Sequence, residues 1–582
     1  GANIGGTGTN AAIDLSANTD VTAQANGAGD VVLSSSGAVT LTNVSTVAGL
    51  IDVQANGTLT ATAVTASGSV GDNSVSLTSN TGDIALGLVQ TLNDAVTLSA
   101  AAGAVTDNNG TSNNLAASTA SITAQNGIGA TNAIEAAVDS FTTVSNTTGN
   151  IDLNLSQASS INSIDVTTGT GNINLVAING LTINNASTQD GSISVVVTGG
   201  DIATGTVSAG SGATVTLNTA TSGSVYLGDI STSGNVSIDS AGRIEDSNAT
   251  ANTDADITSG SASLVADLGI GTERGSLDLS VNQLNTVETL TGGIDINSLI
   301  GATIVNVDNN GTGDLKIATI GDTDYNTTVT TNDGDIVFTV SDGNLSVSNI
   351  VGSGNANIEL ITLGTVGNRD ISVGSVTASG NSIAINALGA VIDLTTTTNT
   401  NFTADSIRLN AGGAIGAAGT GDLRISNSAL VSGSAGGDVF LTGNAGLDIS
   451  SFALNGLFNV NVATDLDLGQ ITTTAGSVTA IAGNNLRVDS VEADVINLTA
   501  TTGSITEAGD DAAADVFSGT GSLNITLTAG SDIGNSDQAL DVGAGTGQTI
   551  TASLTAGASG DSITLSSNRA ITLTTASADG AI

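Results

Sequence analysis

The feature that most constrains the fold of this chain is a loose repeat that begins with an Ile-Gly step. Copies start near Ile4, Ile128, Ile270, Ile415 and Ile533, so they recur 118 to 145 residues apart. Each copy continues with a polar turn and then with segments in which apolar and polar residues alternate, which is the period of a β-strand. Internal repetition of this kind is typical of solenoids and domain arrays, in which one structural unit is stacked many times.

A second motif precedes each of the four later Ile-Gly steps. It consists of a strand-like segment, a turn of small residues with a Gly, and a short apolar step that ends near an acid. The copies read AVTLSAAAGAVTD at 95–107, NVSIDSAGRIED at 235–246, SIAINALGAVID at 382–393 and VINLTATTGSITE at 495–507. Between these motifs the chain forms further short strand-like segments, separated by turns of Gly, Asn, Asp and Ser.

One segment of the second copy resembles a short helix. Residues 134–138 read IEAAV, and they include one of only seven glutamates in the chain. The equivalent segments of the other copies read AIDLS, SLDLSV, DLRIS and ALDVG, and these alternate with period two. The comparison predicts a strand, with Glu135 as an outward-facing polar residue at a position that other copies give to Asp.

The finer period is roughly 20 residues, with two or three short strands in each unit, which corresponds to about 29 units in this length. Such a unit cannot bury a core by itself, but stacked units can, because each strand pairs with its equivalents on both sides. We therefore predict an all-β fold, a parallel β-solenoid (β-helix) of about 20-residue coils that is continuous over residues 1–582. The alternative is an array of tandem β-sandwich domains, which usually carry more aromatic core residues and more Pro.

Composition agrees with a solenoid and excludes several functions. There is no Pro, which would remove a ladder hydrogen bond from a strand paired on both sides, and aromatic residues make up only 2%. The net charge is −45, from 53 acidic and 8 basic residues, which excludes nucleic acid as a partner and disfavours anionic membrane surfaces. Most acids are Asp, a residue of turns. No apolar run approaches 18 residues, so we predict no membrane insertion.

The strand-like segments suggest a family. Gly-Asn-Ile-x-Leu and Gly-Ser-Val-x-Leu segments, such as GNINL at 171–175, DNSVSLTS at 72–79 and GSVTA at 476–480, recur in a chain rich in Thr, Ala, Gly and Asn. In this style the chain resembles the filamentous haemagglutinin-like giant exoproteins of bacteria. The resemblance implies a right-handed parallel β-helix, secretion to the cell surface, and a role in adhesion, matrix or filament building. The Asn-Pro motif of that family's secretion domain does not occur in these residues.

Residue types needed for most catalysis are missing. The chain has no His and no Cys, which excludes Ser-His and Cys-His nucleophiles and the usual zinc sites. Carboxylate pairs such as Asp510–Asp511 and Glu245–Asp246 are expected by chance among so many acids, and only Tyr226 and Tyr325 could stack on a sugar as tyrosines do. The basic residues are scattered: Arg243, Arg274, Lys316, Arg369, Arg408, Arg424, Arg487 and Arg569. We therefore predict no catalytic, cofactor-binding or metal-binding residues, and no enzyme.

Two kinds of segment resemble ligand-binding motifs only in part. The segments DTDYN at 322–326 and NTDAD at 252–256 carry hard oxygen ligands, but only GTGDLKI at 311–317 partly matches the calcium-solenoid signature. Solvated turn acids are the favoured interpretation, which leaves room for weak calcium binding at some turns. The Gly-rich segments GTGTN at 6–10 and GAGTGQ at 543–548 lack the Lys of a phosphate-binding loop, so we interpret both as turns.

The predicted function is structural. We expect an extracellular, cell-surface rod that acts as an adhesin stalk or as a building block of a filament, sheath or matrix. Both ends lie within repeat motifs, so we expect that the chain continues or that copies stack end to end, and that self-association is its main interaction, with cell-surface glycans as further partners. The alternatives are a calcium-stabilised surface-layer protein or adhesin, and a β-helix that binds or cleaves carbohydrate.

Overall fold

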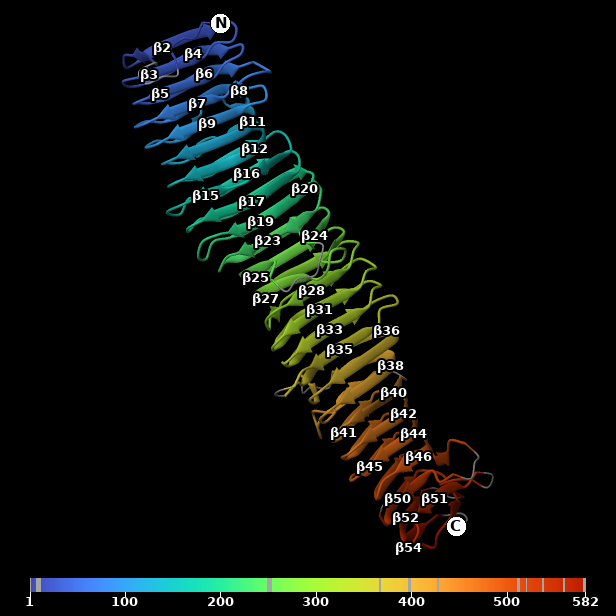
Figure 1. Ribbon diagram of the computed structural model, residues 1–582. Coiled ribbons are helices and arrows are strands. Elements are labelled where there is room, and N and C mark those ends of the chain that lie inside the picture. Colours follow the sequence, from blue (N-terminus) through green and yellow to red (C-terminus); the bar gives the residue numbers. More distant parts are fainter. Residues whose placement is uncertain are drawn as a thin grey trace. The chain divides into compact units, whose positions relative to one another are not determined.

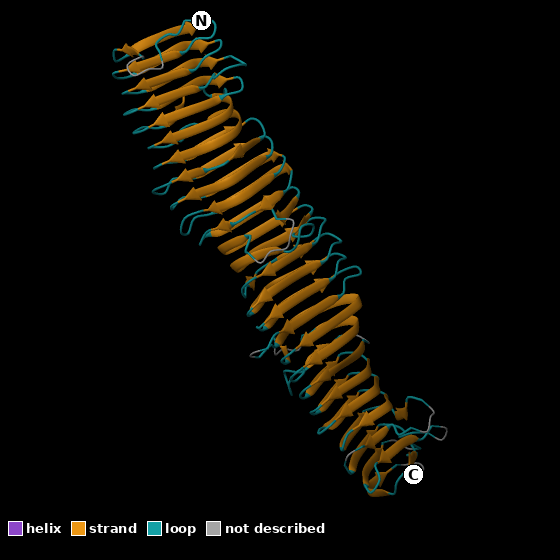
Figure 2. Ribbon diagram, in the orientation of Figure 1, coloured by secondary structure: helices purple, strands orange, loops and turns teal. Residues whose placement is uncertain are grey.

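The structure, a computed structural model, confirms the predicted fold. It describes residues 2–6, 12–248, 254–365, 368–395, 399–426, 429–509, 513–519, 521–535, 538–557, 560–578 and 582. In these residues the protein is all-β, and its parallel strands stack in a solenoid of about 26 coils of about 21 residues each (Figure 2). Inserted loops lengthen some coils, so the coils are fewer than the 29 predicted. No helix that could span a membrane occurs in the described part of the chain.

Two compact units, Gly1–Leu299 and Ile300–Ile582, are distinguished by their internal contacts, and each is described by itself. The strands of the first unit are β1 (Ile13–Leu15), β2 (Thr19–Ala25), β3 (Val31–Ser35), β4 (Val39–Thr46), β5 (Ile51–Ala55), β6 (Leu59–Ala66), β7 (Val75–Ser79), β8 (Ile84–Thr91), β9 (Ala95–Ala100), β10 (Val105–Asp107), β11 (Leu115–Ala124), β12 (Ile134–Asn146), β13 (Ile151–Leu155), β14 (Ser159–Ile161), β15 (Ile164–Val166), β16 (Ile173–Ala177), β17 (Leu181–Thr188), β18 (Ile193–Gly199), β19 (Ile202–Ser208), β20 (Val215–Ser222), β21 (Val225–Leu227), β22 (Ile230–Ser231), β23 (Asn235–Ser240), β24 (Arg243–Asp246), β25 (Ile257–Ala266), β26 (Gly269–Ile270), β27 (Leu277–Thr289) and β28 (Ile294–Ser298).

The strands of the second unit are β29 (Thr303–Ile304), β30 (Val307–Asn309), β31 (Leu315–Ile320), β32 (Thr323–Thr331), β33 (Ile336–Ser341), β34 (Leu345–Gly352), β35 (Ile358–Leu363), β36 (Ile371–Ala387), β37 (Val391–Asp393), β38 (Phe402–Ala411), β39 (Leu423–Ile425), β40 (Leu430–Ala435), β41 (Val439–Gly443), β42 (Leu447–Leu454), β43 (Phe458–Val462), β44 (Leu466–Thr473), β45 (Ser477–Ala482), β46 (Leu486–Glu492), β47 (Val495–Ala500), β48 (Ile505–Glu507), β49 (Val516–Ser518), β50 (Leu523–Ala529), β51 (Leu540–Ala544), β52 (Ile550–Ala556), β53 (Leu565–Ser567) and β54 (Ile571–Ser577).

Most coils contain one straight strand and one bent strand. In the straight strand β5, alternate residues are buried, so Ile51, Val53 and Ala55 point inward. The next strand, β6, buries Leu59 and Ala61, then turns a corner at two less buried residues and resumes the alternation in a new phase. The coil therefore has three sides, and this plan explains why one 20-residue unit was predicted to hold two or three strands.

Stacking of equivalent residues forms the core. In the straight strands β3, β5, β7 and β9, the first inward residues Val31, Ile51, Val75 and Val96 lie in register, one coil above the other (Figure 1). All four are at most 1% exposed. Every pairing given for the described strands is parallel, whereas sandwich sheets are antiparallel, so the tandem-sandwich alternative is wrong.

The second unit has the same plan and shows that its core accepts aromatic side chains. Straight strands β41, β43 and β45 pair in sequence, and bent strands β42, β44 and β46 do the same. Tyr325 and Phe338 are both buried and stack with ring centroids 4.2 Å apart, and Phe452 and Phe458 are also fully buried. Tyr325 is therefore a core residue rather than a surface on which a sugar could stack.

At each Ile-Gly step the straight and bent stacks exchange places. Ile128 pairs with Val105 of the bent stack on one side and with Ile151 of the straight strand β13 on the other. A loop at 129–133 follows, and Ile134 then continues the same straight strand by pairing with Leu153. On the opposite side of the coil, the pairing of β11 with β12 shifts register, and β12 continues as the separate short strands β14 and β15.

The four later Ile-Gly steps show the same exchange, and at the first step the pairings that follow it are alike. A register shift in the originally straight stack occurs between Val21 and Thr22, Ala120 and Ser121, Ala262 and Ser263, Val431 and Ser432, and Ala552 and Ser553. The Gly of every step has a positive φ, between 63° and 79°, which favours Gly over other residues. At Gly129 a Cβ atom would lie 2.3 Å from the backbone oxygen of Asp152 in the next coil. The repeat seen in the sequence thus corresponds to a recurring structural feature, in which a left-handed Gly and a register shift occur together.

The Gly-Asn-Ile and Gly-Asp-Ile segments also have a structural reason. At Gly343 a Cβ would lie 2.2 Å from backbone in the preceding coil. The next residue, Asn344, accepts the backbone N–H of Asp370 at 3.0 Å, and its own N–H donates to Asp322 Oδ1 at 2.8 Å. Turn acids and amides therefore link consecutive coils, with partners roughly 20 residues away, rather than only capping their own turns.

Candidate functional site

Four clusters of buried and partly buried polar side chains recur, one at each Ile-Gly step from the second copy onward. We call each cluster a corner cage, because it lies where a loop is inserted at the corner of the bent stack. The first member ends the strand before the loop, the second resumes the coil after it, and the third occupies the matching place in the next coil. Cage I is Asp107, Asn114 and Glu135; cage II is Asp246, Asp256 and Asp278; cage III is Asp393, Asn401 and Arg424; cage IV is Glu507, Asp515 and Asp541.

One backbone contact is common to all four cages. A side-chain oxygen of the second member accepts the backbone N–H of the third member, which joins two consecutive coils. The distances are 2.9 Å from Glu135 N to Asn114, 2.8 Å from Asp278 N to Asp256, 2.8 Å from Arg424 N to Asn401 and 2.7 Å from Asp541 N to Asp515. The second members are at most 4% exposed, so this hydrogen bond is shielded from water.

Cage I is an acid surrounded by donors. The amide nitrogen of Asn114 donates to Asp107 Oδ1 at 2.7 Å and to the carbonyl oxygen of Leu86 at 2.9 Å. Asp107 also accepts the backbone N–H of Asn109 at 2.8 Å and the amide of Asn132. Burial raises the pKa of Asp107, but these hydrogen bonds together outweigh burial and hold the pKa below its ordinary value.

Glu135 does not behave as a plain outward-facing residue. Its strand, β12, confirms the prediction that 134–138 is not a helix. Its side chain, however, is partly buried against the next coil, where Oε1 accepts the amide of Asn154 at 3.2 Å. The other oxygen, Oε2, is buried without a hydrogen-bond partner among the described residues. Glu135 alternates with the buried Ile134 and Ala136 and therefore lies on the outward side of β12, as predicted, but it is only partly exposed there.

Cage III has the same acid and amide and adds a cation. The amide nitrogen of Asn401 donates to Asp393 Oδ1 at 2.9 Å and to the carbonyl oxygens of Val373 and Gly374. Arg424 Nη1 lies 3.2 Å from Asp393 Oδ2, and the Asp393 side chain is fully buried. Burial raises the pKa of Asp393, but hydrogen bonds from Thr395 and Asn401 and the charge of Arg424 together outweigh burial, so the pKa lies below its ordinary value.

Cage II holds three aspartates and no amide at the second position. Asp246, Asp256 and Asp278 are 3%, 4% and 5% exposed. The side chains of Asp246 and Asp256 hydrogen-bond each other, and Asp278 Oδ1 accepts the amide of Asn297 at 2.7 Å. Burial is the largest contribution that raises the pKa of Asp256, to about 8, and the charges of Asp246 and Asp278 add to it. Burial likewise raises the pKa of Asp278.

The loop beside cage II gathers two of the scattered basic residues. Glu245 is 1% exposed and accepts the backbone N–H groups of the loop residues Thr272, Glu273 and Arg274. Arg243 pairs with Glu273 at 3.0 Å, and the guanidinium of Arg274 lies 4.4 Å from the centre of the Tyr226 ring. These groups therefore hold the loop that follows the Ile-Gly step.

One sequence interpretation holds at this place and another changes. Glu245 and Asp246 are neighbours on β24, so their side chains point to opposite sides of the strand and do not converge on one point. Their adjacency therefore does not produce a facing carboxylate pair. Arg243 and Arg274, which are 31 positions apart in the sequence, are brought to the same loop, although the sequence suggested only scatter. One face of the Tyr226 ring is covered by Arg274, so that face is not open to a sugar.

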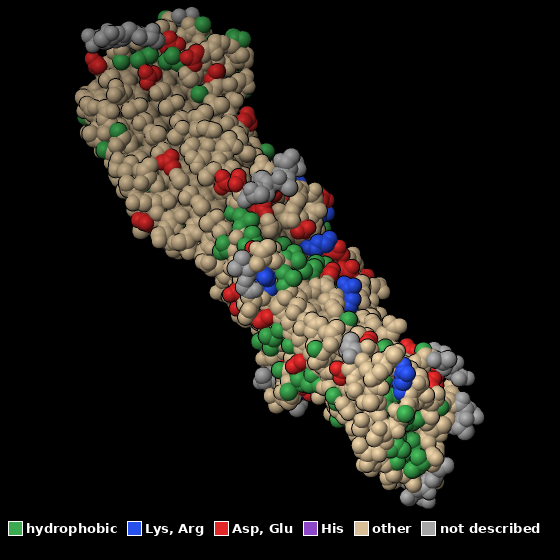
Figure 3. Space-filling model, turned by 60° about the horizontal axis from the view of Figure 1, so that its bottom comes forward, with side chains coloured by type: hydrophobic (Ala, Val, Ile, Leu, Met, Phe, Trp, Pro, Cys, Tyr) green, Lys and Arg blue, Asp and Glu red, His purple; other side chains and the backbone are tan. Residues whose placement is uncertain are grey.

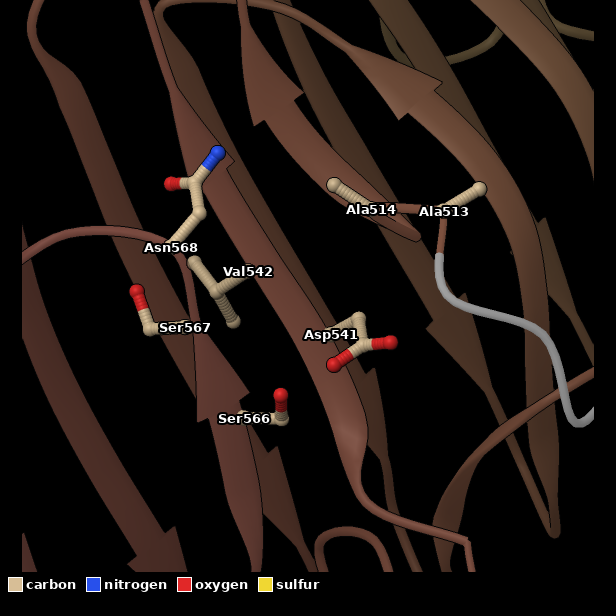
Figure 4. Close-up of a pocket in the computed structure, with 7 residues that line it drawn as sticks. All are labelled: Ala513, Ala514, Asp541, Val542, Ser566, Ser567 and Asn568. Atoms are coloured by element: carbon tan, nitrogen blue, oxygen red, sulfur yellow. The ribbon is translucent and has the colours of Figure 1, made fainter.

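A pocket of about 260 Å³ opens next to cage IV (Figure 4). It is lined by Ala513, Ala514, Asp541, Val542, Ser566, Ser567 and Asn568. Figure 4 shows the carboxylate of Asp541 between the two alanines and Ser566. The Asp510–Asp511 pair noted in the sequence lies outside the described residues. In cage IV itself, Glu507 and Asp515 are 6% and 4% exposed, so a second cage also pairs two acids in the positions that cage I gives to Asp and Asn.

Most of the remaining basic residues take part in local contacts. Lys316 lies 3.0 Å from Asp314, Arg369 lies 3.8 Å from Asp342, and Arg487 lies 3.3 Å from Asp467. Arg569 donates to the carbonyl oxygen of Ala544, and Arg408 is exposed on β38. Figure 3 shows acidic side chains at many separate places on the visible face and basic ones at only a few.

The calcium motifs of the sequence do not form clusters of ligands. Asp322 accepts a backbone N–H of the next coil, Asp324 is exposed, and Tyr325 points into the core. In the second motif, Asp254 is exposed and Asp256 belongs to cage II; residues 252 and 253, like 7–10 of GTGTN, lie outside the described part. Within the described ranges, no three acids are grouped so that they could hold a metal ion. Weak calcium binding stays a prediction.

The cages were missed by sequence reasoning, although part of the signal was visible. The acid that ends each second motif was noted, and it is the first member of a cage. The second member lies 7 to 10 residues later, after a loop of variable length. Comparison of the chain with protein families, with curated proteins and with solved structures found no match. The geometry itself supports a β-helix repeat protein.

Proposed function

We propose that this chain is a rod-like segment of a giant extracellular structural protein, an adhesin stalk or a building block of a surface filament, sheath or matrix. As part of the same proposal, we infer that the chain is related to the filamentous haemagglutinin-like exoproteins, whose strand-like segments its own resemble. On this proposal the chain is extracellular and performs no catalysis. Its partners are further copies of itself and, at the cell surface, glycans.

The observation that carries the proposal is that backbone ladders and many polar side chains join each coil to the next. Within each unit, parallel ladders join consecutive coils, and turn residues such as Asn344 add side-chain links between them. The cage acids and amides bind backbone groups of neighbouring coils rather than pointing together into an open cleft. Contacts between neighbouring repeats determine the stability of a solenoid. Polar side chains that link consecutive coils therefore suit a structural protein that has to resist unfolding.

The proposal is tested on the organism from which the chain comes. Antibodies raised against residues 1–299 are applied to intact cells and to permeabilised cells, and gold labels are located by electron microscopy. We expect labels on the surface of intact cells or along extracellular fibres, with a cytoplasmic protein as the control for leakage. Labelling that appears only after permeabilisation would overturn the extracellular assignment.

The structural role has its own test, independent of location. Cryo-electron microscopy of the protein purified from its source measures whether strands repeat at ~4.8 Å along a rod or fibre. End-to-end contacts between copies would establish a filament subunit. Isolated globular domains without such a repeat would contradict the proposed structural role.

A further inference from the structure

We propose that the carboxyl group of Asp256 is a protonated, neutral acid in the folded protein, and that its O–H group replaces the amide N–H of the other cages, so that cage II is a proton-dependent lock between coils. The proposal goes beyond the structural function above and does not depend on it. It starts from the equivalence of three cages. In cages I and III the second member is Asn, at positions 114 and 401, and in cage II it is Asp256.

The equivalence extends to the partners of the second member. Strand register places Asp107 beside Leu86, Asp246 beside Leu227, and Asp393 beside Val373. In cages I and III, the Asn amide nitrogen donates to the carbonyl oxygen of Leu86 or Val373 and to the neighbouring acid. The partners around this atom are therefore all acceptors, and the position requires a donor.

Asp256 meets the same requirement only when it carries a proton. Its Oδ2 accepts the backbone N–H of Asp278 at 2.8 Å, just as the Asn oxygen does in the other cages. The equivalence of the cages puts its other oxygen in the place of the amide nitrogen, and the Asp256 side chain hydrogen-bonds that of Asp246. Two ionised carboxylates have no hydrogen to share, so this bond needs one proton between them.

The charged surroundings also favour a neutral acid. Asp246 faces Asp256 from β24, Asp278 faces it from β27, and Asp254 precedes it in the loop and acts on Asp278. The nearby cations are engaged elsewhere, because Arg243 pairs with Glu273 and Arg274 with Tyr226 and the carbonyl of Ser247. In cage III, by contrast, Arg424 balances the buried acid directly.

The sign of the pH dependence follows. A group that holds its proton more tightly when folded stabilises the fold fully below its ordinary pKa of 3.8, and that contribution is lost as pH rises towards the folded value of about 8. Cage II is therefore locked in acid and released in mild alkali.

The experiment follows hydrogen exchange of the full-length chain between pH 5 and 9, corrected for intrinsic rates, in peptides that contain the Asp278 amide. The variants are Asp256→Asn, which supplies a permanent donor, and Asp267→Asn, which removes the same charge from an exposed position. Wild type and Asp267→Asn should lose protection about tenfold per pH unit as the pH rises from 5 to about 8, and the loss should level off above that pH. Asp256→Asn should show a flat profile and at least tenfold more protection at pH 9. Identical profiles for wild type and Asp256→Asn would overturn the proposal.

Two further measurements keep the proposal falsifiable. In Asn114→Asp, the Glu135 amide should lose exchange protection as pH rises, as the Asp278 amide does in wild type. An unchanged pH profile at Glu135 would count against the equivalence of the cages. Infrared spectra at pH 6 should contain a protonated carboxyl C=O band that disappears in Asp256→Asn but not in Asp267→Asn; its absence from wild type would refute the proton. If calcium restores protection at pH 9 and a chelator removes it at pH 6, a cation rather than a proton holds the carboxylates, and the proposal fails.

Discussion

Cages II and III are built on the same backbone plan and solve the same problem with different chemistry. Each encloses a buried aspartate, Asp246 or Asp393, next to an inserted loop. Cage III neutralises that charge with Arg424 and supplies a permanent donor through Asn401. Cage II has neither group and surrounds its acid with two more aspartates. The difference shows that the fold fixes where a polar group must lie but leaves open whether a cation, an amide or a proton satisfies it.

Removal of the cation from cage III should have the largest effect. Arg424→Met leaves the fully buried Asp393 side chain without its ion-pair partner, and loss of one member of a buried pair costs about 3–5 kcal/mol. We expect a matching loss of local stability, measured by hydrogen exchange in peptides spanning 391–426. The control is Arg487→Met, because the Arg487–Asp467 pair is 50% and 42% exposed and such pairs contribute about 0–1 kcal/mol. Equal losses for both variants would show that burial does not distinguish these pairs.

The Ile-Gly steps, each of which from the second copy onward lies between the second and third members of a cage, offer the second test. Gly129→Ala forces a left-handed residue, at about 1–2 kcal/mol, and places a Cβ 2.3 Å from a carbonyl oxygen of the next coil, which adds an overpacking cost of roughly 1–3 kcal/mol. Gly110→Ala shares the positive φ but meets no atom within 4 Å, so only the first cost applies. Denaturant midpoints measure the loss of stability in both variants, and hydrogen exchange at 126–155 measures the local loss around Gly129. If Gly110→Ala were the more damaging variant, close packing at the step would not be the reason for Gly.

The third prediction concerns opposite responses to acid. The lowered pKa of Asp107 and of Asp393 means that their contribution is present above the ordinary value and is lost as pH falls through the lowered folded value. The raised pKa of Asp256 gives the reverse sign, with a contribution that is lost as pH rises through about 8. Titration from pH 7 to pH 3 should therefore weaken exchange protection at cages I and III while cage II keeps or gains it. Three cages that respond in the same direction would contradict the difference drawn between amide and acid.

The sequence could predict the features that recur at regular spacing, which are the strands and the positions of the Ile-Gly steps. Alternation placed Ile134 in a strand, and recurrence of the Ile-Gly step marked the positions where the stacks exchange. The cages could not be predicted, because a loop of variable length separates their members, as between Asp246 and Asp256. Alternation also cannot tell whether an acid in an apolar pattern faces solvent or the interior, and Asp393 faces the interior. Such a choice depends on partners from the next coil, which local patterns do not contain.

The smallest predicted effect separates the cages from the ordinary turns. Asn344 uses its side-chain oxygen as Asn401 does, to accept a backbone N–H of the next coil, but Asn344 is exposed. In Asn344→Ala, water can satisfy the freed N–H of Asp370, so we expect a loss of only about 0.5–1 kcal/mol, the net value of an ordinary hydrogen bond. The control is Asn349→Ala, whose amide donates only to the hydroxyl of Thr328 and should change little.

The same truncation at Asn401 completes this test, because burial is then the main variable. Asn401→Ala removes the acceptor of the buried Arg424 N–H, which costs about 1–3 kcal/mol, and also removes the amide that donates to Asp393 Oδ1 and to the carbonyl oxygens of Val373 and Gly374. Exchange protection at the Arg424 amide should therefore fall by orders of magnitude more than protection at the Asp370 amide does in Asn344→Ala. A comparable fall at both sites would mean that coil-to-coil links are equivalent along the solenoid and that the cages are not special reinforcements. A large fall confined to the cage would identify the inserted corners as the places where the stability of each repeat is set.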